Sequence, residues 1–278
     1  MAHTSFTSGT IPFEGDRANS IVFDATGRYM VADTRIFTSN TEWFDLQIEA
    51  GTLVAHPTRP FVANVREDGF DLIDLATKTH RAVALEDTDS GTFSHDGERF
   101  AVACYETNEI RIFDLDGNRA SVLRAPEQWT APGLCFSRKA PEILAFNDSA
   151  VVALVPLSGA ASRELPLKKS KVLSGRCVAF DDAVLYEDSA NLSFVSYEGE
   201  LRWALRAEHE SVARVPGTNV IALVRMGKKS ISYLDANGKE IASTKIKITA
   251  APLGFACNAT HAAWAQDGGL SLVEHPRL

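Results

Sequence analysis

The chain has 278 residues, 45% of them apolar and 23% charged, and 36 acidic residues outnumber 28 lysines and arginines. The formal net charge of −8 argues against a nucleic acid or an anionic membrane as partner, because phosphate neutralisation needs clustered lysine and arginine. No apolar run approaches the roughly 18 residues of a membrane helix, and the first residues lack the pattern of a signal peptide. We therefore expect a cytoplasmic protein with a large core.

The four cysteines, Cys104, Cys135, Cys177 and Cys257, lie in apolar, strand-like stretches. None of them forms a C-x-x-C motif or stands at zinc-finger spacing from a histidine. This pattern predicts buried thiols in a reducing compartment and no metal site.

The first predicted element is a strand at 5–13, which precedes a series of seven weak repeats. The first strands of these repeats lie about 40 residues apart, which is the period of β-propeller blades. They pass through Phe23, Val54, Phe93, Phe136, Phe180, Val215 and Cys257.

Each repeat has the same order of apolar strands and polar turns, best seen in the third. There an apolar strand is followed by the turn at 95–98, a second strand at 100–103, a third at 110–113 and a fourth at 119–124. The hairpin between the third and fourth strands places Gly117, and later Gly199 and Gly238, where the chain must take a positive φ. No window shows a convincing helical period, so the chain is predicted to be all-β.

The two ends complement each other. The last repeat runs through 270–274 and stops one strand short, whereas the segment 1–13 supplies one strand too many. Pairing the two would close the ring and remove an exposed sheet edge. We therefore predict one domain over 1–278, a monomeric seven-bladed β-propeller of four-stranded antiparallel blades, in which 1–13 closes the last blade.

The third repeat resembles the WD40-like repeat of seven-bladed propellers. Its segment Phe93-Ser94-His95-Asp96-Gly97 is close to the F-S-P-D-G turn of that family, and Phe113-Asp114 stands where Trp-Asp usually stands. Ile73-Asp74 and Leu234-Asp235 occupy the same place in the second and sixth repeats. The chain has no Gly-His and no Trp-Asp dipeptide, so the family's buried hydrogen-bond network is not expected here. The segment 56–62 is also similar to the turn and strand of YVTN/lactonase-type propellers.

Loops on one face of such a scaffold are the expected place of function. The loops that join fourth strands to first strands, and second strands to third strands, share that face. They are acidic in the second, third and fifth repeats and basic in the fifth and sixth, which could steer a charged peptide or be an ordinary solvated surface. Trp129 is an aromatic residue in a polar loop, either an interface anchor or a side chain folded over its own blade. The predicted partner-binding residues are Arg66, Tyr105, Trp129, Tyr186 and Arg225.

Catalytic signals are weak. The acid pairs Glu67/Asp68, Asp87/Asp89 and Glu187/Asp188 allow a carboxylate-pair hydrolase, and His209 lies between two glutamates on the same face. His56, His95 and His261 fall near turns of the opposite face, where a structural role is expected. No nucleophile elbow, phosphate-binding loop or zinc-protease motif is present. We therefore expect a non-catalytic protein-interaction scaffold with no cofactor, no metal and no catalytic residue.

One alternative is kept from a different class of protein. A lactonase-like, metal-dependent hydrolase would need side chains such as Glu67, Asn147 and Asp188 to converge on one ion at the mouth of the channel.

Overall fold

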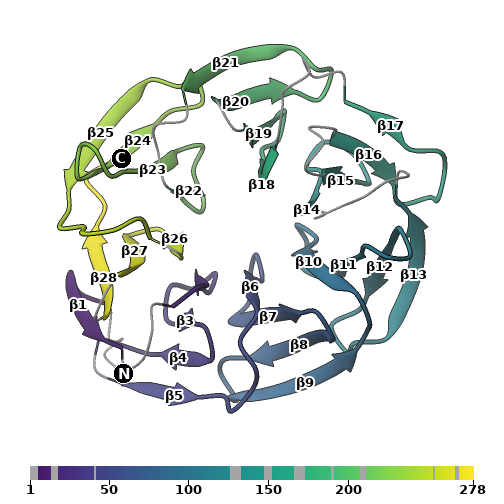
Figure 1. The fold of residues 1–278 in the computed structure, drawn as a ribbon, viewed down its shortest axis with the longest axis horizontal. Helices are drawn as coiled ribbons and strands as arrows, with labels where there is room; N and C mark the ends of the chain where they lie inside the picture. Colours follow the sequence, from purple (N-terminus) through teal and green to yellow (C-terminus); the bar gives the residue numbers. More distant parts are fainter. Residues whose placement is uncertain are drawn as a thin grey trace. The chain divides into compact units, whose positions relative to one another are not determined.

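The computed structural model describes residues 6–13, 18–40, 42–125, 133–146, 152–165, 173–188, 191–206, 211–252, 254–266 and 269–278, with the side chains of 173–177 and 188 excepted. Within these ranges, 28 strands form seven four-stranded antiparallel sheets and no helix occurs (Figure 1). The fold is the predicted seven-bladed β-propeller.

The first three blades follow the chain, each with its strands in sequence order. Blade 1 has β2 (Ile21–Phe23), β3 (Met30–Ala32), β4 (Arg35–Phe37) and β5 (Trp43–Asp45). Blade 2 has β6 (Thr52–Ala55), β7 (Phe61–Arg66), β8 (Gly69–Asp74) and β9 (Thr79–Ala84). Blade 3 has β10 (Thr88–Phe93), β11 (Phe100–Cys104), β12 (Glu109–Phe113) and β13 (Arg119–Arg124).

The next three blades repeat that order. Blade 4 has β14 (Gly133–Phe136), β15 (Glu142–Phe146), β16 (Val152–Pro156) and β17 (Arg163–Glu164). Blade 5 has β18 (Leu173–Ala179), β19 (Ala183–Asp188), β20 (Asn191–Ser196) and β21 (Leu201–Arg206). Blade 6 has β22 (Ser211–Arg214), β23 (Ile221–Arg225), β24 (Ser230–Leu234) and β25 (Glu240–Lys245).

Blade 7 joins the two ends of the chain, as the sequence predicted. It has β26 (Phe255–Cys257), β27 (His261–Gln266), β28 (Gly269–Glu274) and, as its outermost strand, β1 (Gly9–Pro12). Gly9 lies opposite Leu272 and Pro12 opposite Gly269. The N-terminal strand therefore supplies the fourth strand of the last blade.

The turns between third and fourth strands contain the residues from which the repeat was recognised in the sequence. Gly117, Gly199 and Gly238 have φ values of 74°, 86° and 76°, the left-handed conformation that was predicted. Before the first of these glycines, Asp114 Oδ1 accepts a hydrogen bond from the Asn118 N–H at 2.8 Å. Asp235 does the same for Lys239 at 3.0 Å. The apolar-Asp dipeptides of the sequence thus end a buried strand and fix the turn that follows.

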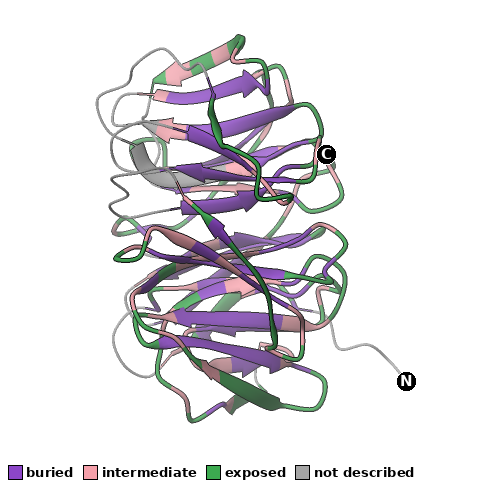
Figure 2. Cartoon of the chain, turned by 90° about the vertical axis from the view of Figure 1, so that its right-hand side faces the viewer, coloured by how far each residue is buried: buried purple, intermediate pink, exposed green. Residues whose placement is uncertain are grey.

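The described core lies between neighbouring blades. One cluster combines Phe23 and Met30 of blade 1 with Leu270 of blade 7 and with Ile11 of the closing strand. The second strands of blades 3 and 4, β11 and β15, are buried along their whole length, whereas the outermost strand β13 is largely exposed. Figure 2 shows buried strands and exposed loops throughout the described chain. Apolar middle strands and polar outer strands are what a stack of sheets requires.

The chain divides into two compact units. The first comprises 1–64, 73–79 and 208–278, and the second comprises 65–72 and 80–207. Blade 7 with its closing strand belongs to the first unit, and the loops that follow β7, β9 and β11 belong to the second. The expectation of a single domain remains a prediction.

Candidate functional site

Three loops of the second unit are joined by main-chain hydrogen bonds. The crossover from β9 to β10 is bound to the β7–β8 turn, because the Leu85 N–H donates to the Asp68 carbonyl at 3.0 Å and the Thr88 N–H donates to the Glu67 carbonyl at 3.1 Å. On its other side, the Asp87 carbonyl accepts the Tyr105 N–H of the β11–β12 turn at 3.1 Å. Their side chains are therefore presented from a pre-organised surface, which we call the blade 2–3 loop surface.

A positive φ occurs at two of these loop positions, and it fixes where the side chains point. Asp87 has φ 59° and Asn108 has φ 50°. Aspartate and asparagine tolerate this left-handed conformation better than other side chains. Gly69 begins β8 with φ 143°, and a Cβ there would lie 2.1 Å from the Val83 carbonyl oxygen. The close approach of β8 to β9 beneath the loop surface therefore requires glycine.

Arg66 is held by two carboxylates. Its Nε donates to Asp68 Oδ1 at 2.9 Å, and its Nη1 donates to Asp71 Oδ2. The Arg66 side chain is 15% exposed, that of Asp71 3% and that of Asp68 71%. Thr88 Oγ1 also donates to the Arg66 carbonyl. Arg66 thus ties the base of the loop surface to the interior of blade 2.

The blade 2–3 loop surface is strongly acidic around Tyr105. The pKa of the Tyr105 phenol is raised, first by desolvation and then by surrounding negative charges. In decreasing order of effect, those charges belong to Asp87, Glu67, Glu106 and Asp89. Desolvation also raises the pKa of the Asp89 carboxyl. Carboxylates from three separate loops therefore produce a negative electrostatic field at the Tyr105 side chain.

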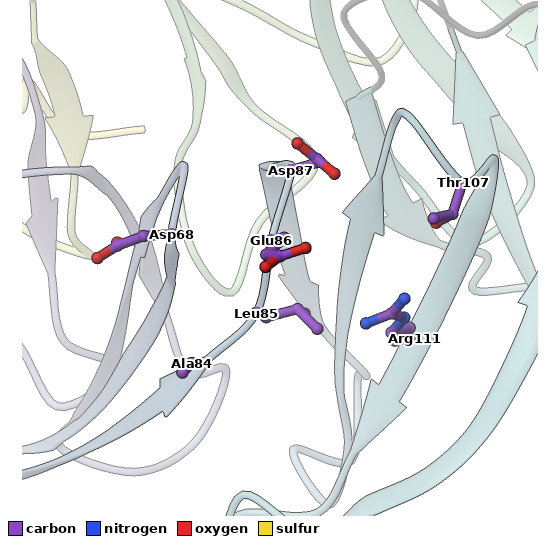
Figure 3. Close-up of a pocket in the computed structure, with 7 residues that line it drawn as sticks. All are labelled: Asp68, Ala84, Leu85, Glu86, Asp87, Thr107 and Arg111. Carbon is purple, nitrogen blue, oxygen red and sulfur yellow. The ribbon is translucent and has the colours of Figure 1, made fainter.

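A pocket of about 390 Å³ lies beside this acidic group (Figure 3). It is lined by Asp68, Ala84, Leu85, Glu86, Asp87, Thr107 and Arg111. Arg111 comes from β12 and its Nε donates to Glu109 Oε2 at 2.9 Å. In Figure 3, Glu86 and Asp87 lie between Asp68 on one side and Thr107 and Arg111 on the other. The pocket therefore combines a carboxylate-rich side with a single guanidinium.

Two of the predicted partner-binding residues lie on the blade 2–3 loop surface. Arg66 and Tyr105 belong to it, whereas Glu86, Thr107 and Arg111 were not singled out. The signal for Arg111 is the alternation in Glu109-Ile110-Arg111-Ile112: Ile110 and Ile112 are core residues, so Arg111 lies on the other side of β12.

The other predicted residues lie elsewhere. Tyr186 was expected in a loop but lies within β19, 6% exposed and in the core with Val184 and Tyr197. The polar residues Glu187 and Asp188 suggested a loop, but the strand β19 continues through them. Arg225 ends β23 in the first unit, where its Nε is buried without a hydrogen-bond partner among the described residues. Trp129 is outside the described residues. The binding roles of all five remain predictions.

The turn histidines have the structural roles expected of them. His56 Nδ1 accepts the N–H groups of Thr58 and Arg59 at 3.1 and 3.0 Å. His95 Nε2 is 2.9 Å from the Phe136 carbonyl oxygen, and His261 Nδ1 is 2.9 Å from Thr260 Oγ1. Each imidazole ring thus forms a hydrogen bond within its turn or to a neighbouring strand.

Metal-dependent chemistry gains no support from the described residues, which contain no group of three or more His, Cys, Asp and Glu side chains able to hold an ion. The alternative hydrolase relied on Glu67, Asn147 and Asp188. Asn147 is outside the described residues, as is the side chain of Asp188. His209, the histidine between two glutamates, is also outside them.

The described cysteines Cys104, Cys135 and Cys257 are buried and form no disulfide with one another. Burial strongly raises the pKa of the Cys257 thiol, so it is a core side chain and not a nucleophile.

Comparison with known proteins adds no relative. No family model matches the chain, and none of the curated proteins is significantly similar to it. In the part of the chain that is described, no helix could cross a membrane.

Proposed function

We propose that this protein is a non-catalytic, WD40-like interaction scaffold that binds a peptide or a partner domain through its loops. The observation that supports this most is the blade 2–3 loop surface, where main-chain hydrogen bonds fix three loops that carry exposed carboxylates. Fixed loops lose little conformational entropy on binding, which favours recognition of a partner. A cytoplasmic location remains part of the proposal.

Affinity capture from the native cell, followed by mass spectrometry, tests this function. The wild-type chain is compared with Tyr105→Ala, Trp129→Ala and Arg225→Glu, with Glu164→Gln on the exposed strand β17 as the control. We expect a partner that wild type and Glu164→Gln capture equally and that at least one loop variant captures several-fold less.

Two results would count against this proposal, one against the function and one against the residues named for it. Capture of no protein above the background of an unrelated acidic protein would reject the function itself. A partner captured equally by all four variants would leave the scaffold but place its binding surface away from these loops.

A further inference from the structure

The pocket of the blade 2–3 loop surface offers hydrogen-bond acceptors that the protein leaves free. Glu86 and Asp87 line it, and within the described ranges neither carboxylate forms a hydrogen bond or an ion pair. Glu86 is exposed and Asp87 is half-buried. Two carboxylates on successive residues attract a cationic group that enters the pocket.

The same pocket offers a donor of the opposite charge. The Arg111 side chain is 20% exposed and its Nε is bound to Glu109. Its two Nη groups have no partner among the residues that the structure describes. Glu109 neutralises the charge of Arg111, so the free Nη groups can donate to a neutral carbonyl oxygen without repelling a nearby cation.

A metal ion does not fit this arrangement. In the view of Figure 3 the carboxylates of Asp68, Glu86 and Asp87 point in different directions, and within the described ranges they form no metal-binding group. The pocket volume of about 390 Å³ lies at the lower end of the range for organic ligands. This volume suits one long amino-acid side chain together with the main chain of the same residue.

We propose that this pocket receives a lysine or arginine side chain of the partner's peptide, with Glu86 and Asp87 binding the cation and Arg111 donating to the peptide main chain. This inference rests on the proposed scaffold function and names the chemistry of its partner. Glu67, Asp89 and Glu106 extend the negative field beyond the pocket. They speed the approach of a basic segment, an effect that salt screens.

The test uses the full chain and a defined probe, the capped peptide acetyl-Gly-Ser-Gly-Ser-Arg-Ser-Gly-Ser-Gly-amide. Its binding is followed by amide chemical shifts in NMR and compared with versions that carry lysine, citrulline or glutamate at the centre. We expect saturable shifts at residues 85–89 and 107–111 with arginine or lysine. We expect at least tenfold weaker binding with citrulline, which keeps the shape of arginine without its charge.

The variant Glu86→Gln/Asp87→Asn isolates the carboxylates. Asparagine tolerates the positive φ of residue 87, so we expect an unchanged melting temperature and at least tenfold weaker binding. The control Glu164→Gln/Asp116→Asn removes the same charge from exposed residues of the same unit and should bind as wild type.

The variant Arg111→Gln distinguishes two hypotheses, a pocket in which Arg111 donates hydrogen bonds and an acidic patch that binds by charge alone. Removing a positive charge would strengthen the binding of a cationic peptide to a patch, whereas the proposed pocket loses a donor and should bind several-fold more weakly. Unchanged or tighter binding would reject the role of Arg111.

Equal binding of the arginine and citrulline peptides, or no binding of either, would overturn the pocket proposal. The scaffold function would survive that result if affinity capture still found a partner. Conversely, saturable peptide binding with no captured partner would leave the pocket chemistry in place and reject the cellular function.

Discussion

Arg66 has an exposed and a buried carboxylate on the same guanidinium, and the two have different consequences for stability. Asp68 lies at the surface, where an ion pair contributes about 0–1 kcal/mol. Asp71 is buried and its charge is compensated by Arg66. Losing one partner of a buried pair leaves an uncompensated charge, which costs about 3–5 kcal/mol.

We predict that Asp71→Ala lowers the free energy of unfolding by about 3 kcal/mol, whereas Asp68→Ala lowers it by less than about 1 kcal/mol. Urea denaturation of both variants measures the difference. Equal losses would show that Arg66 does not depend on the buried carboxylate.

Two histidines at the end of blade 7 are shielded from solvent, His261 buried and His275 half-buried. His275 Nε2 is 2.9 Å from the Asn258 carbonyl oxygen, and its Nδ1 is 2.9 Å from the Tyr233 hydroxyl. Burial lowers the pKa of both His275 and His261 from the ordinary 6.5. Below about pH 6.5 the unfolded chain therefore binds protons that the folded chain does not, and stability decreases as pH falls.

Substituting His275→Gln should reduce this acid sensitivity. We expect the loss of unfolding free energy between pH 7.5 and pH 5.5 to be smaller in the variant than in wild type, although the variant is less stable at pH 7.5. The same pH slope in both proteins would show that His275 titrates normally in the folded state.

At the scale of elements, the closing segment 6–13 contributes both a sheet partner, the strand β1, and core side chains. Ile11 is 2% exposed and Phe6 3%, and both belong to the core cluster shared with blade 1. Asn40 of blade 1 also binds Thr7 in both directions, at 3.0 and 2.9 Å. Losing β1 exposes the edge of β28 and removes this packing.

We predict that a chain lacking residues 1–13 melts at least 10 °C lower than wild type or is insoluble, and that the peptide 1–13 added in trans restores part of the loss. Ile11→Ala, which keeps the backbone pairing, should cost about 2–5 kcal/mol. A truncated chain that melts like the full length would contradict closure by β1.

The same elements show how far sequence reasoning reached. The strands of the repeats lie at or next to the predicted places, with Phe180 and Val215 one residue beyond the ends of β18 and β22. The agreement is close because turn signals such as Asp96-Gly97 are local. Tyr186 was misplaced because the end of an apolar strand has no local signal when polar residues such as Glu187 continue it. The pocket could not be predicted from the sequence. Asp68, Asp87 and Arg111 come from three separate segments, and only the pairing of the strands brings these segments to one pocket.

At the scale of the whole molecule, the first and last strands of the chain, β1 and β28, pair in one sheet. The Glu274 N–H donates to Ser8 Oγ at 2.9 Å, so the last strand ends where the first begins. Ends that lie close together tolerate circular permutation when the new opening is an exposed loop. Gly159 is such a place, since a Cβ there would meet nothing within 4 Å.

We predict that a chain with its ends joined by a short Gly/Ser linker and opened between Gly159 and Ala160 keeps the β-sheet circular dichroism and the cooperative melt of wild type. In this permutant β17 completes blade 4 from the new N-terminus, as β1 completes blade 7 in the native chain. A permutant opened between Ala153 and Leu154, within the buried strand β16, should not fold. Loss of structure in both permutants would contradict the adjacency of the ends.

The sequence by itself determined the class of fold, the number of blades and the closing strand, because apolar alternation, turn residues and a repeat are properties of neighbouring residues. The arrangement of the blade 2–3 loop surface was decided only by the tertiary structure. Whether Arg66 faces a partner or the buried Asp71, and whether Glu86, Asp87 and Arg111 share one pocket, depends on which loops the strand pairing brings together. The sequence gives the charge and chemistry of each side chain, but it does not give the distances between side chains of different loops.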